Sequence, residues 1–269
     1  MNASAQLNQL HFDRQLIKDF ADLVSRYGDK EFKSPLRSTI PLLSLVRDGW
    51  SVLQEVLMAC HLPAESNLHF EYKVNSPLGI GIPSHTDVMA RSGSDQLALE
   101  CKWTEPRYET VGKWMLKPPD PDRHGKPTDP DNRRKRLAGW LRLLQPYATC
   151  DLHVEAFSDI VYQMVHRAAS ACAETKRPQL AYVLFTPLPD GKPVHRKQYE
   201  DDLKHLHQTL GNPPRFPFHL IEVELAPTNA FQAIERLPKA SSQTAKTVQD
   251  ALRKGGLFRF SEIKHQTIR

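Results

Sequence analysis

Hydrophobic and polar residues alternate in two short runs, and this pattern predicts a β-hairpin. The inward positions are Thr86, Val88 and Ala90 in the first run and Leu97, Leu99 and Cys101 in the second. A Ser-Gly-Ser turn signal separates the runs. We take Gly93-Ser94 as a two-residue loop, with glycine at the position that a type II′ turn reserves for positive φ. Facing residues then have numbers that sum to 187.

This register brings charged side chains together on one face of the hairpin. Asp87 faces Glu100, and His85 faces Lys102; because side chains alternate, these four share one face and the aliphatic residues share the other. Two facing carboxylates repel by about 1 kcal/mol or less in a solvated sheet, and by more where water is excluded. A divalent cation that prefers oxygen ligands would offset this cost, and Lys102 is placed to orient an attacking water. The alternative is the ordinary charged face of an exposed hairpin.

Helical and strand periodicities predict the elements on either side of the hairpin. In chain order these are helices over residues 13–27 and 40–60 (bent near Gly49), a strand over 68–74, a helix from Ser158 to Cys172, a strand over 179–186, a helix over 197–210, a strand over 216–225 and a basic helix over 240–254. The continuous apolar run at 179–186 is typical of a strand that is buried on both faces.

Residues 106–136 are predicted to form a long basic loop, because prolines interrupt regular structure there. The prolines are Pro118, Pro119, Pro121, Pro127 and Pro130. The aromatic and cationic residues Trp103, Arg107, Tyr108 and Trp114 stand near its start, and Arg133, Arg134, Lys135 and Arg136 end it. This combination favours a clamp over a nucleic-acid backbone, with the basic residues on phosphates. The alternative is the solvated first turn of a helix.

Composition narrows the class of protein. The chain has 269 residues, a net charge of +5 and four cysteines that never form a C-x-x-C pair. The charge suits a polyanionic partner, and the cysteines indicate reduced thiols in a cytosol. The sequence shows no secretion signal and no apolar run of membrane-spanning length, so we expect a cytoplasmic protein without a membrane partner.

The hairpin residues also carry a resemblance. An Asp on one strand followed on the next by Glu-x-Lys, here Asp87 and Glu100-Cys101-Lys102, resembles the signature of the PD-(D/E)XK nuclease superfamily. Thr86 stands where the family name expects proline, a residue that supplies no ligand. The surrounding residues are similar to a group of predicted restriction endonucleases, and the resemblance spans residues 41–187.

The resemblance implies a fold and a division of the chain. The fold is α/β, a restriction-endonuclease-like αβββαβ core with a central mixed sheet flanked by helices. Residues 1–40 would form an N-terminal helical addition, 41–225 the nuclease core with its basic loop over 106–136, and 226–269 a C-terminal extension.

It also implies a chemistry: a Mg²⁺-dependent deoxyribonuclease of restriction or antiviral-defence type, with Mn²⁺ able to substitute. Asp87, Glu100 and the backbone carbonyl of Cys101 would be the metal ligands, and Lys102 would orient the attacking water and stabilise the phosphate charge. The expected partner is double-stranded DNA, and a homodimer is left open.

Further residues are weighed as additions to this site. They are Glu55 and Glu71 as extra acidic contacts, Gln163 as the one match to a Gln-x-x-x-Tyr helix motif in which Arg167 replaces the tyrosine, and His85 on the charged face. The competing class is a non-catalytic nucleic-acid-binding or assembly protein on the same fold. A hydrolase of small phosphate esters is disfavoured by the basic composition.

Overall fold

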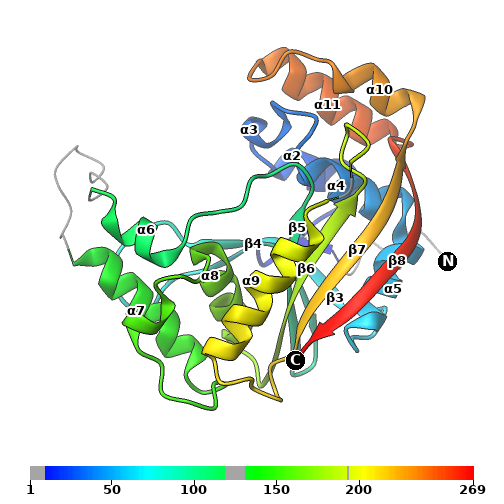
Figure 1. Ribbon diagram of the computed structural model, residues 1–269. Coiled ribbons are helices and arrows are strands. Elements are labelled where there is room, and N and C mark those ends of the chain that lie inside the picture. The colour runs from blue at the N-terminus through cyan, green and yellow to red at the C-terminus, as the bar shows by residue number, and fades with distance from the viewer. Residues whose placement is uncertain (1–9, 119–130, 193) are drawn as a thin grey trace.

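One mixed β-sheet runs through the computed structural model, which describes residues 10–118, 131–192 and 194–269 (Figure 1). Its eight strands lie in the order β2-β1-β3-β4-β5-β6-β7-β8. Their bounds are β1 Leu10–Phe12, β2 Gln15–Leu16, β3 Asn67–Val74, β4 Ser84–Ser92, β5 Asp95–Lys102, β6 Arg177–Thr186, β7 Phe218–Pro227 and β8 Phe258–Ile268. The β1/β3, β5/β6 and β6/β7 pairs are parallel, and the other neighbours are antiparallel.

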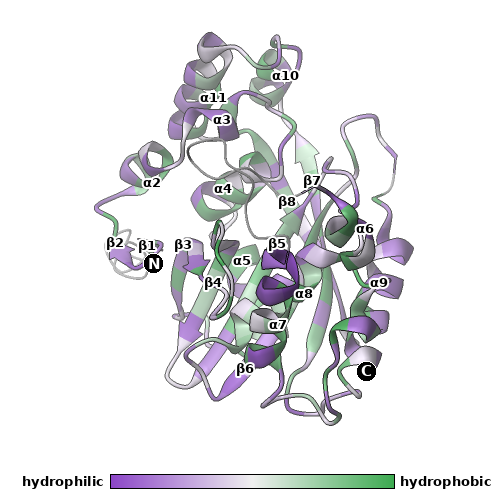
Figure 2. Ribbon diagram, turned by 90° about the vertical axis from the view of Figure 1, so that its left-hand side faces the viewer, coloured by the Kyte–Doolittle hydropathy of each residue, from purple (hydrophilic) through white to green (hydrophobic). Residues whose placement is uncertain are grey.

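Helices cover both faces of this sheet and divide the buried hydrophobic residues into two clusters. The first face carries α2 Phe20–Arg26, α3 Asp29–Phe32, α4 Thr39–Asp48, α5 Trp50–Ala59, α10 Asn229–Glu235 and α11 Ser242–Lys254. The second carries α6 Val111–Leu116, α7 Asn132–Leu144, the 3₁₀ helix η1 Val154–Phe157, α8 Tyr162–Cys172 and α9 Arg196–Thr209. Hydrophobic positions gather on the central strands, and hydrophilic ones on outer helices such as α9 and α11 (Figure 2). The predicted α/β class with a central mixed sheet flanked by helices is confirmed.

The strand that the continuous apolar run predicted is β6, which lies between β5 and β7 with helices on both faces. All its residues except the two terminal ones are buried. A strand in this position meets apolar surroundings above and below, so its sequence shows no alternation.

The bend predicted near Gly49 is confirmed as a break between α4 and α5. A Cβ atom at Gly49 would lie 2.7 Å from the Phe260 ring and 2.8 Å from the Leu45 side chain. A larger residue at this position would have to displace the Phe260 ring and the Leu45 side chain, so glycine suits the break between the two helices.

Both chain ends add strands to the sheet, which the sequence pattern did not predict. The predicted helix over residues 13–27 is shortened to α2 at Phe20–Arg26 and preceded by the strand β2, while Leu10–Phe12 pairs with β3 as β1. In the predicted C-terminal extension, Phe258–Ile268 pairs with β7 as β8. A three-residue strand is too short for alternation to reveal, and it forms because β3 offers it an edge.

The predicted loop over residues 106–136 is partly helical. Helix α6 occupies Val111–Leu116, and α7 begins at Asn132, so the basic cluster is already helical. Pro119, Pro121, Pro127 and Pro130 lie outside the described residues. Within the described part of the chain, none of the helices has the length and apolar character needed to cross a lipid bilayer.

Candidate functional site

The β4–β5 hairpin has the predicted register along most of its length. The pairs run from Ser92 with Asp95 to Val88 with Leu99, and Gly93 has φ +57° as the two-residue turn requires. Pairing stops at Val88 and Leu99, one position before Asp87 and Glu100. The acid pair therefore sits where the two strands separate, rather than inside the ladder.

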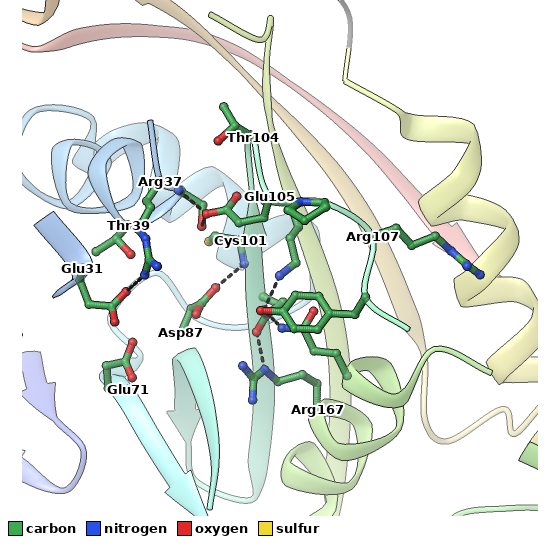
Figure 3. Close-up of a pocket in the computed structure, with 16 residues that line it drawn as sticks. Glu31, Arg37, Thr39, Glu71, Asp87, Cys101, Thr104, Glu105, Arg107 and Arg167 are labelled. Carbon is green, nitrogen blue, oxygen red and sulfur yellow. Dashed lines mark hydrogen bonds and ion pairs between the residues drawn. The ribbon is translucent and has the colours of Figure 1, made fainter. Parts of the chain in front are cut away.

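The Asp87 side chain takes the place of a backbone hydrogen-bond partner for Cys101, where the pairing of β4 with β5 has stopped. Its Oδ2 accepts a hydrogen bond of 2.7 Å from the backbone N–H of Cys101 (Figure 3). A carboxylate between the strands keeps the Cys101 amide satisfied, and the separation relieves the repulsion expected of directly facing carboxylates.

His85 does not face Lys102 as predicted. It lies opposite Lys73 on β3, and its Nδ1 is 3.1 Å from Oε2 of Glu71. The register count failed here because β4 turns away from β5 and continues along β3.

Glu71 holds a strained backbone conformation opposite Asp87. It lies between Phe70, paired with Val88, and Tyr72, paired with Thr86, and its φ is +51°. The alternation of β3 reverses there, since Phe70 packs in the first hydrophobic cluster and Tyr72 in the second. A left-handed conformation costs a glutamate about 1 kcal/mol or more. In this conformation the Glu71 carboxylate lies beside a cavity, described below, that Asp87 also lines.

Glu100 is buried and held by three donors. Lys102 Nζ and Gln163 Nε2 each donate to Oε1 at 2.8 Å, and Arg167 Nε donates to Oε2. Gln163 and Arg167 are four residues apart on α8 and so share one helix face. The structure places Gln163 beside the acid pair, together with Arg167, whose contact with Glu100 the sequence pattern did not predict.

The surroundings shift the pKa values of Asp87 and Glu100 in opposite directions. Burial raises the pKa of Asp87 well above its ordinary value, and the charge of Glu100 adds to the rise. Burial also opposes ionisation of Glu100, but Arg167 and Lys102 outweigh it and lower the pKa of that carboxyl. Burial works against the charge of Lys102, yet Glu100 and Asp87 raise the pKa of its ammonium above the ordinary value. Of the two carboxyl groups, Asp87 is therefore the one whose ionised form its surroundings disfavour.

These residues line a cavity of about 440 Å³ (Figure 3). Its other lining residues include Glu31, Arg37, Ser38, Thr39, Thr104, Glu105, Pro106, Arg107 and Tyr108. Five acidic residues line it, Glu31, Glu71, Asp87, Glu100 and Glu105, and the Cys101 side chain packs into the first hydrophobic cluster. This is a set of hard oxygen donors, which fits Mg²⁺ or Mn²⁺ and not a thiolate-preferring ion.

Glu105 joins the cavity to the first turn of α4 and was not assigned by sequence reasoning. Its Oε1 accepts from the backbone N–H and the hydroxyl of Ser38, at 2.7 and 2.8 Å, and its Oε2 accepts from Trp103 N–H at 3.0 Å. The only available signal was its place shortly after Lys102. Tyr108 was predicted for the clamp, and its ring lies 5.0 Å from Lys102 Nζ.

The predicted basic cluster divides into residues with different environments. Arg133 is buried and donates to the backbone carbonyls of Trp114 and Lys117. Arg136 donates to the carbonyl of Ile82 at 3.0 Å. Arg134 and Lys135 are exposed, and Arg134 also pairs with Glu155 at 2.6 Å. Arg133 therefore stabilises the fold, and contact of Arg134 and Lys135 with phosphates stays a prediction.

Two aromatic residues of the predicted clamp are buried. Trp103 packs into the first hydrophobic cluster, and Trp114 stacks on Tyr162 with ring centroids 3.8 Å apart. Arg107 forms two hydrogen bonds to Asp202 on α9, of 2.8 and 2.7 Å. Glu55, the other predicted acidic contact, is exposed on α5 and is not among the residues that line the cavity.

Comparison with known proteins gives one family match. A family model described as a domain of unknown function (DUF6946) matches residues 16–210. No curated protein and no solved structure has significant similarity to the chain. The matched range includes β3, β4, β5, α8 and β6, and it also includes every residue that lines the cavity.

Proposed function

The chain belongs to the DUF6946 family, and we propose that it is a metal-dependent nuclease that hydrolyses phosphodiester bonds in DNA. The observation that carries this proposal is the meeting of Asp87, Glu100 and Lys102 in one polar cavity, where β4 and β5 separate. The order α4/α5, β3, β4, β5, α8, β6 supports it, since it agrees with the αβββαβ core of the PD-(D/E)XK superfamily that the hairpin resembles.

The cavity residues divide the work of such a reaction. Asp87, Glu100 and the Cys101 backbone carbonyl would hold Mg²⁺, with Glu71 as a further carboxylate. When bound, the cation supplies positive charge beside the scissile phosphate. It also favours the ionised form of Asp87, so cation binding and loss of the Asp87 proton are coupled.

Lys102 acts as a cation rather than a base, because its neighbours keep it protonated. Its ammonium is fixed by Glu100 at 2.8 Å, and the residue as a whole is only 4% exposed. In that position it orients the attacking water and stabilises negative charge that develops on the phosphate oxygens. Arg167 adds a second fixed positive charge on the far side of Glu100.

DNA is the proposed polymer on the strength of the resemblance, and the net charge of +5 agrees with a polyanion. A restriction or phage-defence role in the cytoplasm follows from the same resemblance. Arg134 and Lys135 at the start of α7 would contact the phosphate backbone outside the cavity.

One observation favours a second candidate, a non-catalytic nucleic-acid-binding protein on the same fold. Both oxygens of Glu100 already accept hydrogen bonds from α8 and Lys102, so a cation must compete with Arg167 for this carboxylate. A binder would retain that ion pair as a structural bond and would show no cleavage.

The deciding experiment incubates purified protein with supercoiled plasmid, linear duplex, single-stranded DNA and RNA, each with Mg²⁺, Mn²⁺ or chelator. We expect metal-dependent cleavage that Asp87→Ala, Glu100→Ala and Lys102→Ala each abolish, with losses that do not add because the three act as one unit. Glu65→Ala is the matched control, since Glu65 is exposed and outside the cavity. Binding of DNA without cleavage under every metal condition would favour the second candidate.

A further inference from the structure

A second cluster of metal-ligand side chains lies between α5 and the strands β7 and β8. Cys60 caps the end of α5, His219 is on β7, and His265 is on β8. One ligand atom from each lies within 4.8 Å of the other two. None of the three lines the cavity of the proposed nuclease site.

The hydrogen bonds of His219 settle which of its nitrogens carries a lone pair. Its Nε2 is 2.9 Å from Oε1 of Gln179, an oxygen that can only accept, so Nε2 carries the hydrogen. In the neutral imidazole, Nδ1 then has a lone pair, and it points at Nε2 of His265 at 3.0 Å. A ligating histidine is commonly fixed by an acceptor on its other nitrogen in this way.

The separations agree with a shared tetrahedral ion. Two nitrogens bound to one Zn²⁺ at the usual bond lengths lie about 3.3 Å apart, and a sulfur and a nitrogen about 3.6 Å apart. The histidine nitrogens are within a few tenths of an ångström of that spacing. The sulfur of Cys60 lies within 4.8 Å of a ligand nitrogen of each histidine. A small movement of a side chain would bring it to the spacing that a shared ion requires.

Burial gives the cluster a closed side and an open side. Cys60 and His219 are 0% and 1% exposed, whereas His265 is exposed on the edge strand β8. An ion can therefore enter past His265, and a solvent molecule or the adjacent exposed His61 can complete its coordination. No disulfide competes for the thiol, since Cys60 is a free cysteine.

We propose that Cys60, His219 and His265 bind a transition-metal ion that prefers thiolate and imidazole ligands, with Zn²⁺ as the best match. Mg²⁺ is excluded by the donor set, because hard cations take oxygen ligands. The bound ion joins the end of α5 to the two last strands of the sheet, and its binding releases the thiol proton of Cys60. This proposal does not depend on the nuclease proposal.

The test uses Co²⁺ as a spectroscopic probe on the full chain after treatment with a chelator. We expect one equivalent of Co²⁺ to produce a thiolate charge-transfer band and tetrahedral visible bands, and one equivalent of Zn²⁺ to remove both. Cys60→Ser should abolish the charge-transfer band, whereas Cys150→Ser, which alters an exposed cysteine, should retain it.

Two further variants keep the test decisive if Cys60→Ser folds poorly. His265→Gln changes an exposed residue, and it should remove the rise in melting temperature that Zn²⁺ gives the wild type; His205→Gln on the exposed face of α9 is its control. Gln179→Ala should weaken Zn²⁺ binding about 10- to 100-fold, as loss of a supporting hydrogen bond does at other metal sites. Absence of a thiolate band in the wild type, or a Zn²⁺ response that survives His265→Gln, overturns the proposal.

Discussion

Replacing Asp87 with asparagine is expected to stabilise the metal-free protein at neutral and alkaline pH. The Asp87 carboxylate is partly buried beside Glu100, and both conditions raise its pKa well above 3.8. Asparagine retains an oxygen that can accept the 2.7 Å hydrogen bond from Cys101 N–H, and it removes the charge. The substitution therefore separates the electrostatic cost of Asp87 from its structural contact.

The pH dependence follows from the direction of the shift. A carboxyl whose pKa is raised on folding adds stability that is fully present below the unfolded pKa, near 3.8, and is lost as pH rises through the folded pKa. At a pH above the folded pKa, each unit by which folding raises the pKa lowers the free energy of unfolding by about 1.4 kcal/mol. We expect Asp87→Asn to gain on the order of 1–2 kcal/mol at pH 8, and to lose its advantage as the pH falls toward the unfolded value.

Thermal melts in chelator and in Mg²⁺ or Mn²⁺ measure both effects. A gain of 1 kcal/mol raises the melting temperature of a protein of this size by roughly 2 °C. The metal should stabilise the wild type and leave Asp87→Asn unchanged, because an ion stabilises only the state that binds it. Asp159→Asn, at an exposed aspartate, is the control and should change neither quantity. A variant that is less stable in chelator yet responds fully to metal would refute this reasoning.

Four other substitutions test the packing of the fold and its basic surface. Arg167→Ala should lower the free energy of unfolding by about 3 kcal/mol in urea titrations, because it removes one partner of a buried ion pair with Glu100. Arg133→Ala should cost about 1–3 kcal/mol in the same measurement, since it removes the buried guanidinium that donates to the carbonyls of Trp114 and Lys117. Arg134→Ala should change stability by less than about 0.5 kcal/mol, but should flatten the dependence of log DNA affinity on log salt. Gly139→Ala should lower the melting temperature, because its Cβ would lie 2.0 Å from a serine hydroxyl.

The hairpin shows how far sequence reasoning reached. A two-residue loop fixes register, and alternation fixes faces, so the pairs from Ser92–Asp95 to Val88–Leu99 could be counted from Gly93 alone. The separation of Asp87 from Glu100 could not be predicted, because it depends on how β4 continues along β3. Local periodicity contains no information about a third strand.

The donors to Glu100 show a similar limit. Helical spacing placed Gln163 and Arg167 on one face of α8, but spacing does not say which element that face meets. Contact with Glu100 follows from the packing of α8 on the second face of the sheet. Arg133 shows the opposite error, since all four basic residues were assigned to phosphate contacts while the helix turned one of them inward.

The left-handed backbone at Glu71 has a consequence for variant libraries. Glycine adopts positive φ without the penalty that a glutamate pays, and asparagine pays less of it. A screen that ranks variants by melting temperature alone would enrich both residues at position 71 and discard the carboxylate there. Under the proposed nuclease function, position 71 is thus a place where heat resistance and activity select different residues, and a library that scores both traits would separate them.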